Sequence, residues 1–244
     1  MRIPRIYLPT PLTIDTEIEL DPRAHQHVTK VLRLRAGDKI TLFSGQGGEY
    51  LATLTTSDKR SACAHIDSFV DNHPETPLKI TLLQGISRGE KMDLTIQKAV
   101  ELGVSAIRPV NSERSQVKLS GERLEKRMQH WQGVLIHACE QSGRTILPRL
   151  SPVQNLDTCL TSGDLPGLRF LLDPNGRQSI RDLTGPIHSL VLLAGPEGGL
   201  GEQDQAIAGT AGFKGLRLGP RILRTETAAL AAIAALQGQW GDLN

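Results

Sequence analysis

From residue 78 onward, short apolar runs alternate with segments of helical spacing, and this alternation constrains the fold more than any other feature. The apolar runs are LKITLLQGIS, VSAIRPV, LRFLLD, LVLLAG and GLRLG. The first is followed by a pattern that predicts a helix ending near Gly103, with apolar positions at Met92, Ile96, Ala99 and Val100. A longer helix is predicted over residues 121–141 from Leu124, Met128, Trp131, Leu135 and Ala138. Strands that alternate with helices predict an α/β fold with a largely parallel sheet covered on both faces.

The first 72 residues have a different pattern. KITLFSG and EYLATLTT flank Gln46–Gly48, which predicts a β-hairpin, and SACAHIDSFV has the composition of a further strand. Residues 71–77, DNHPETP, are polar and contain two prolines, so they are the best linker candidate. We therefore predict a small β domain over residues 1–72, with a barrel as one possible form, and an α/β domain over residues 73–244.

Composition limits the function classes. The formal net charge of +2 is too small to indicate nucleic-acid binding by itself. The three cysteines form no CxxC pair, which argues against a disulfide framework and for a reducing compartment. The N-terminus lacks the apolar region of a signal peptide, and no stretch approaches the length of a membrane span. We expect a soluble, cytoplasmic protein without membrane association.

Two predicted strands end in a Gly-Pro dipeptide. LVLLAG continues into the turn Gly195–Gly199, and LRLG continues into Pro220. Glycines at the carboxyl ends of parallel strands let the backbone approach a ligand, although one such turn alone is more often only a tight strand-to-helix connection. Neither turn matches a P-loop or the GxGxxG dinucleotide motif. Two neighbouring loops of irregular backbone suit a flat heterocycle such as adenine, held by main-chain hydrogen bonds.

The segment between the second Gly-Pro turn and the alanine-rich helix is RILRTETAAL. Thr225 is predicted to be the N-cap of this helix, and Glu226 in the first turn complements the helix dipole. Neither capping nor the helix dipole accounts for Arg224, and folding does not require a charge at this position. The small residues of the helix permit close backbone approach, either in a packed core or at a subunit interface.

Basic residues follow several predicted elements. Arg88 and Lys91 follow the first strand of the α/β domain, Arg114 follows the next strand, and Arg144 follows the long helix. Arginines at successive element ends suggest phosphate contacts at one sheet edge, while each alone is more often a surface charge. The histidines predict no metal site, because the pairs His25/His27 and His130/His137 lack metal-ligand spacing and an accompanying carboxylate.

Several motifs resemble a known family. GPEGG at 195–199 and LGPRILRTETAAL at 218–230 resemble the knotted SPOUT class of S-adenosylmethionine-dependent RNA methyltransferases. SRGEKMDLTIQKAVELGV, NSERS and ACEQSGR narrow the resemblance to the family that methylates N3 of one uridine in the decoding region of 16S rRNA. HVTKVLRLRAGDKITLFSGQGGEYLATL resembles the PUA-like RNA-binding barrel of the same family. One departure is Gly201, where the family often has Ser or Thr at the cap of the next helix.

The resemblance implies a SPOUT domain with a deep trefoil knot, an exception to the rule against knotted chains, and a homodimer. It also implies that S-adenosylmethionine binds in the knot loops. The residues that match the family's cofactor contacts are Leu172, Gly195, Pro196, Glu197, Gly198, Gly199, Leu218, Gly219, Leu223 and Thr225.

The implied reaction also suggests roles for three side chains. Uracil N3 must lose a proton, and a guanidinium near O2 or O4 would stabilise the resulting anion. Arg224 is the first candidate for this role and Arg88 the second. Glu226 is a candidate general base, with solvent as the alternative.

The expected partner is 16S rRNA within the small ribosomal subunit. The expected RNA contacts are Arg2, Arg5, Tyr7, Arg33, Arg35, Lys91, Arg114 and Arg144. Two alternatives stay open: a SPOUT enzyme with another target atom such as the ribose 2′-hydroxyl, and a non-catalytic RNA-binding or assembly protein.

Overall fold

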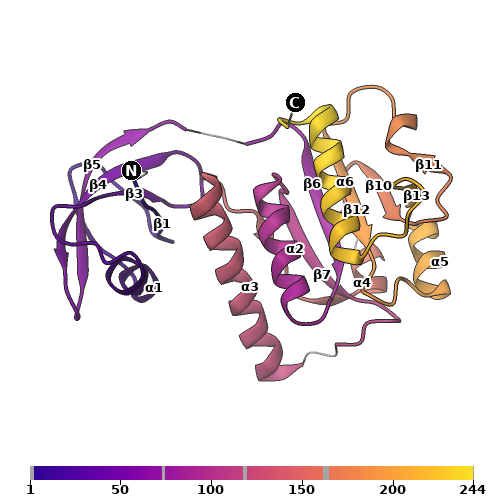
Figure 1. The fold of residues 1–244 in the computed structure, drawn as a ribbon, viewed down its shortest axis with the longest axis horizontal. Helices are drawn as coiled ribbons and strands as arrows, with labels where there is room; N and C mark the ends of the chain where they lie inside the picture. Colours follow the sequence, from indigo (N-terminus) through magenta and orange to yellow (C-terminus); the bar gives the residue numbers. More distant parts are fainter. Residues whose placement is uncertain (1–2, 73–74, 118–119, 162–164, 244) are drawn as a thin grey trace. The chain divides into compact units, whose positions relative to one another are not determined.

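A computed structural model of the chain describes residues 3–72, 75–117, 120–161 and 165–243 (Figure 1). The chain packs as two compact units. Unit 1 consists of Met1–Glu75 together with Ile136–Leu147, and unit 2 of Thr76–Leu135 together with Pro148–Asn244. Unit 1 therefore includes the C-terminal turns of a long helix whose first part belongs to unit 2.

Unit 1 is built on a five-stranded sheet of order β1-β3-β4-β5-β2. Its strands are β1 (Arg5–Tyr7), β2 (Glu17–Glu19), β3 (Lys39–Phe43), β4 (Glu49–Ser57) and β5 (Ala62–Val70). β3 and β4 pair antiparallel, so the predicted hairpin is confirmed. Gly45, Gly47 and Gly48 all have positive φ in its loop, a conformation that glycine adopts without steric cost.

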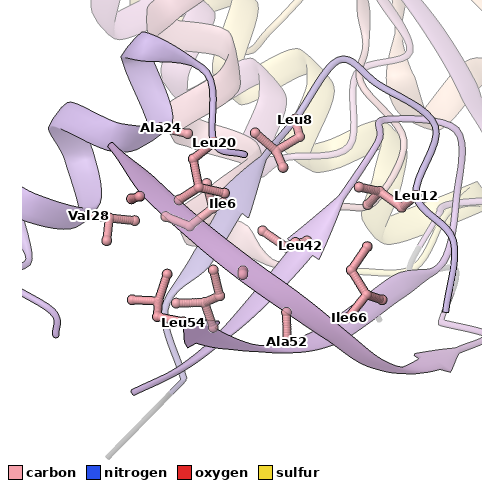
Figure 2. Packing of buried hydrophobic residues seen from close by; sticks show 13 residues of the cluster. Ile6, Leu8, Leu12, Leu20, Ala24, Val28, Leu42, Ala52, Leu54 and Ile66 are labelled. Carbon is pink, nitrogen blue, oxygen red and sulfur yellow. The ribbon is translucent and has the colours of Figure 1, made fainter. Parts of the chain in front are cut away.

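One short helical segment closes the core of unit 1. α1 (Pro22–Gln26) starts at Asp21, whose carboxylate accepts the Ala24 N–H at 2.7 Å. It continues directly into the π-helix η1 (His27–Val31). Figure 2 shows how side chains from the sheet and from α1 and η1 meet in one apolar core. Its members include Ile6, Leu8, Ala24, Val28, Leu42, Leu54 and Ile66.

Unit 2 is built on a parallel sheet with the order β11-β13-β10-β12-β6-β7-β8, and β9 pairs with β7. The described strands are β6 (Lys79–Gly85), β7 (Ala106–Asn111), β8 (Arg149–Leu150), β9 (Gln154–Asn155), β10 (Leu168–Leu172), β11 (Gln178–Ser179), β12 (Ser189–Ala194) and β13 (Lys214–Arg217). The helical elements are α2 (Glu90–Glu101), α3 (Gly121–Ser142), α4 (Leu156–Thr161), η2 (Ile180–Asp182), α5 (Glu202–Thr210) and α6 (Thr225–Trp240).

Helices cover both faces of the unit 2 sheet. Leu83, Val191 and Leu193 share an apolar cluster with residues of α4 and α5. Their neighbours Leu82 and Leu192 are also fully buried, and alternate residues of a strand face opposite sides. α2 and α6 pack against each other and α6 packs against β12 (Figure 1). The predicted α/β fold with a small N-terminal β-rich part is thus confirmed, but unit 1 differs from the predicted domain of residues 1–72 because it also includes Ile136–Leu147.

The strand order places the carboxyl ends of β10, β12 and β13 next to one another. β6, β7 and β8 follow one another in one direction from the centre, whereas β10 and β13 lie on the other side of β12. Such a reversal leaves a crevice at the carboxyl ends of the central strands, where ligands of parallel sheets usually bind. Separately, among the residues described, no helix combines the length and hydrophobicity that a membrane crossing requires.

Candidate functional site

A cavity of about 710 Å³ lies at the carboxyl ends of β10, β12 and β13, entirely within unit 2. Three chain segments supply most of its wall: residues 171–175, residues 194–200 and the stretch that leads from β13 into α6. The residues expected to contact a cofactor are all in this wall except Gly219: Leu172, Gly195, Pro196, Glu197, Gly198, Gly199, Leu218, Leu223 and Thr225. Lys91, Arg224 and Glu226 line the same cavity.

The loop of residues 195–199 is fixed by close backbone contacts. The Gly199 N–H donates to the Pro196 carbonyl at 2.8 Å, and Gly199 has φ +69°. Under the loop lies Gly85, the last residue of β6. A Cβ atom there would lie 2.5 Å from Pro196 N, closer than real Cβ atoms approach other atoms. Gly85 is therefore required for the loop to cross β6 at this height.

Charged groups hold the same loop from the side. The Glu197 carboxylate accepts the Arg88 N–H at 3.0 Å and lies 3.3 Å from Lys91 Nζ. The Arg114 guanidinium donates to the Gly198 carbonyl at 3.3 Å. Burial acts to raise the pKa of Glu197, but the Arg88 N–H and the Lys91 ammonium outweigh it and hold this pKa below its usual range. Arg88, Lys91 and Arg114 thus meet around one loop.

Thr225 connects this loop to the second one. The Thr225 hydroxyl donates to the Gly195 carbonyl and accepts from Gln84 Nε2 at 3.2 Å. The predicted N-cap role of Thr225 is wrong. Arg224 occupies the N-cap, with extended backbone at φ −65° and ψ 154°, and makes no side-chain capping bond. The Thr225 side chain is instead used to join the loops that follow β12 and β13.

Two charged side chains in the cavity differ in their surroundings. Glu226 is only 8% exposed, and its Oε2 atom has no hydrogen-bond partner within the part of the chain that the structure describes. Arg224 is exposed, and no acidic side chain among the described residues pairs with its guanidinium. The site therefore offers a buried carboxylate oxygen and an accessible cation from adjacent residues.

Several residues of the cavity wall were not predicted. Asp173, Pro174 and Asn175 follow β10 directly, and the Asn175 N–H donates to Asp173 Oδ1 at 2.9 Å. The argument that ligands bind at strand ends applies to LRFLLD as it does to the Gly-Pro turns, so it could have found them. Arg221 and Ile222, which lie within the motif of residues 218–230, also line the cavity, and Gln205 lines it without a sequence signal of its own.

The structure also explains Gly201. It is the N-cap of α5, and its N–H donates to Asp204 Oδ2 at 3.1 Å. A Cβ atom on Gly201 would lie 1.7 Å from Glu113 Oε2. Asp204 also accepts the Glu113 N–H at 3.0 Å. In this structure the exposed carboxylate of Glu113 occupies the space that a Ser or Thr side chain would fill, so a larger residue at position 201 requires that side chain to move.

In unit 1, the structure corrects two of the expected RNA contacts. Arg5 pairs with Glu49 and is largely buried, and Arg144 is 5% exposed and donates to Glu75 through Nε at 3.0 Å and Nη2 at 2.6 Å. Both guanidinium groups form internal ion pairs. Burying a charge without a partner costs several kcal/mol of desolvation, so buried charges are usually paired. The Tyr7 ring is half-buried against Phe43, with ring centroids 5.7 Å apart. Arg33 and Arg35 are exposed as expected, and Arg2 lies outside the described residues.

Comparisons with known proteins give two family models that match successive parts of the chain. The family model of the RNA methyltransferase domain matches residues 74–237, and that of the RNA methyltransferase PUA domain matches residues 20–67. A relative from Buchnera aphidicola, named ribosomal RNA small subunit methyltransferase E, is 35% identical over 100% of this chain and 99% of its own. A relative of the same name from Bacillus subtilis is 30% identical over 87% of this chain and 86% of its own.

Two solved structures resemble the whole chain. Ribosomal RNA small subunit methyltransferase E from Neisseria gonorrhoeae, bound to S-adenosylmethionine, superposes with a TM-score of 0.95 at 44% identity, covering 100% of both chains. A candidate methyltransferase from Legionella pneumophila, with the same cofactor bound, superposes with a TM-score of 0.95 at 40% identity and 100% coverage of both chains.

The contact between Gly85 and Pro196 can be tested directly. We expect Gly85→Ala to displace the loop of residues 195–199 and to lower the free energy of unfolding by about 1–3 kcal/mol, as overpacking does elsewhere. Urea denaturation followed by circular dichroism measures this. Gly209→Ala is the matched control, because Gly209 lies on α5 with no heavy atom within 4 Å of an added Cβ. Equal stability of both variants would contradict the steric argument.

Proposed function

The chain belongs to the RNA methyltransferase family, and from this premise we propose that it transfers a methyl group from S-adenosylmethionine to ribosomal RNA of the small subunit. In finer terms, the proposed target is N3 of one uridine in the decoding region of 16S rRNA. The observation that carries the proposal is the cavity of unit 2, because the two family motifs at 195–199 and 218–230 supply most of its wall.

The cavity suits S-adenosylmethionine in size and chemistry. Its volume of about 710 Å³ falls within the range of about 300–1,000 Å³ typical of small-molecule sites. Leu172, Leu218 and Leu223 offer apolar surface for an adenine ring, and the backbone of residues 195–199 offers donors and acceptors. Asp173 and the free Oε2 atom of Glu226 can accept hydrogen bonds from hydroxyl or ammonium groups. When bound, S-adenosylmethionine supplies a methyl group already activated for transfer.

Arg224 is proposed to act on the RNA base. Uracil N3 must be deprotonated before it can accept a methyl group, and the negative charge then spreads to O2 and O4. A cation held near one of these oxygens stabilises that charge, as oxyanion-hole donors do in other enzymes. Arg224 suits this role because it lines the cavity, is exposed and is not neutralised by a neighbouring carboxylate of the described residues. Arg88 stays the second candidate: its main chain holds Glu197, and its side chain is exposed.

Glu226 is proposed to accept the N3 proton. Glu226 is among the residues that line the cavity, and its Oε2 atom is buried and has no partner among the described residues. A carboxylate oxygen without a protein donor can bind an N–H group from substrate. Its place in the first turn of α6 favours negative charge through the helix dipole.

Further parts of the proposal concern the assembly. We propose that unit 1 binds RNA, with Arg33 and Arg35 among its contacts and Tyr7 stacking on a base. Lys91 and Arg114 are proposed to contact RNA beside the cavity. Two copies are proposed to pair through α6, where Thr227, Ala231 and Ala235 form a small, exposed face. The trefoil knot, which the family resemblance implies, and the cytoplasmic location, which the cysteines and the N-terminal sequence favour, stay predictions.

The proposed reaction is tested by methyl transfer from labelled S-adenosylmethionine to small ribosomal subunits from cells that lack the enzyme. Digestion of the RNA should place the label in 3-methyluridine. Label in a 2′-O-methylated nucleoside would keep the enzyme class and replace the target atom. No label, beside an active control enzyme on the same subunits, would favour a non-catalytic RNA-binding protein.

For Arg224→Ala, we expect kcat to fall by about 10²–10³, the cost of removing one donor to a developing anion, with little change in the Kd for S-adenosylmethionine. Single-turnover kinetics and calorimetry measure the two quantities. Arg123→Ala, an exposed arginine on α3, serves as the charge-matched control. Equal losses of turnover and cofactor affinity would remove Arg224 from the catalytic role.

For Glu226→Gln, we expect a loss of about 10²–10⁴ in kcat if the carboxylate is the general base, because the amide has similar size but cannot accept the proton. Raising the pH should recover part of the rate, since hydroxide then deprotonates uracil. The pH profiles of kcat for the wild type and the variant measure this. Identical profiles would assign the proton to solvent instead.

A further inference from the structure

A cluster of two histidines and one glutamate lies in unit 1, outside the proposed active site. His27 is the first residue of the π-helix η1, and His137 and Glu140 lie one turn apart near the end of α3. Their potential ligand atoms all lie within 4.8 Å of one another. The two imidazole rings face each other with centroids 5.4 Å apart and planes inclined by 31°. Residues separated by 110 positions thus converge on one point.

Glu140 is the fixed member of this cluster. It is buried, and its Oε1 atom accepts the Tyr7 N–H at 3.0 Å and Arg23 Nη1 at 3.0 Å. Its Oε2 atom faces His137 Nδ1 at 2.9 Å. One oxygen is therefore held by the protein while the other points at the histidines. This is the way in which hydrogen bonds from neighbouring groups usually orient a metal-binding carboxylate.

The backbone at His27 is also unusual. A π-turn runs from His27 to Leu32, whose N–H donates to the His27 carbonyl at 2.9 Å. π-turns are rare, and they occur frequently at functional sites because the wider turn redirects a side chain. Here the turn begins at the residue that faces His137 and Glu140.

We propose that His27, His137 and Glu140 form a binding site for a divalent transition-metal ion, with Zn²⁺ as the best fit. Two imidazoles and one carboxylate are ligands of the type that Zn²⁺ takes, and they suit Mg²⁺ or Ca²⁺ poorly. Ligand atoms around tetrahedral Zn²⁺ lie about 3.3 Å apart, given bond lengths of about 2.0–2.2 Å. Binding of the ion therefore requires the two histidine side chains to move closer to each other and to Glu140.

The surroundings define the kind of site. His137 is exposed and His27 half-buried, so a fourth position is open to water. Arg23 binds only Oε1, which leaves Oε2 for the ion but places a positive charge nearby. We therefore expect moderate, reversible binding. An ion held here would link η1 to the end of α3 and stabilise unit 1, separately from methyl transfer.

Cobalt and zinc titrations of the full-length, untagged protein test the proposal. We expect one equivalent of Co²⁺ to produce visible d–d absorption, and Zn²⁺ to displace it and raise the Tm, since an ion that binds only the folded state stabilises it. His27→Gln and His137→Gln should each weaken binding by about tenfold or more. His130→Gln is the matched control, because His130 is exposed on the same helix α3 and lies outside the cluster.

Several outcomes would overturn the proposal. They are the absence of Co²⁺ binding to the wild-type protein, unchanged binding in both cluster variants, or an equal loss in the His130 control. Circular dichroism of each variant checks its folding, and Glu140→Gln is avoided because Glu140 also holds Tyr7 and Arg23. Methyl-transfer activity is not the readout, so failure here is distinguishable from failure of the proposed function.

Discussion

The site in unit 2 depends on the Thr225 hydroxyl, which joins two loops that are 30 residues apart in the sequence. It donates to the Gly195 carbonyl and accepts from Gln84, whose side chain is fully buried at the end of β6. One hydroxyl group thereby fixes two segments of the cavity wall to each other and to the end of β6. Gly85 then sets the height of the Pro196 turn over the sheet. A loop held by both a buried hydrogen bond and a steric limit is preorganised, and this reduces the entropy lost when a ligand binds.

The sequence predicted the strand ends well because periodicity and glycine placement are local properties. The alternation after residue 78 located the parallel sheet, and the Gly-Pro turns located two walls of the cavity. The error at Thr225 has a physical cause: a threonine before an alanine-rich helix satisfies the N-cap pattern, and only the tertiary structure shows that its hydroxyl has a better acceptor. The trefoil knot is a property of chain threading, and no periodicity encodes it.

Local sequence patterns do not reveal contacts between residues that lie far apart in the sequence. Arg144 follows a helix in the way that Arg88 and Arg114 follow strands. Its guanidinium is nevertheless buried and paired with Glu75. The histidine spacing predicted no metal site, because neither pair has ligand spacing within its own segment, whereas the cluster proposed as a metal site combines residues of two elements. His137 has Glu140 three residues later, and its second partner is His27, which the fold supplies from 110 positions away. A search by sequence spacing cannot find a site whose ligands come from two elements.

A net charge of only +2 is compatible with the RNA binding proposed for unit 1, because the charge is unevenly distributed. Unit 1 neutralises Arg5, Arg23 and Arg144 internally with Glu49, Glu140 and Glu75. The glutamates of these three pairs therefore do not neutralise the exposed basic residues of unit 1, which are Lys30, Arg33, Arg35, Lys39, Lys59 and Arg60. Phosphate contacts act over about a Debye length, so local surface charge matters more than the sum over the chain. The paired arginines belong to the internal structure of unit 1, and the exposed basic residues, Arg33 and Arg35 among them, form the surface proposed to bind RNA.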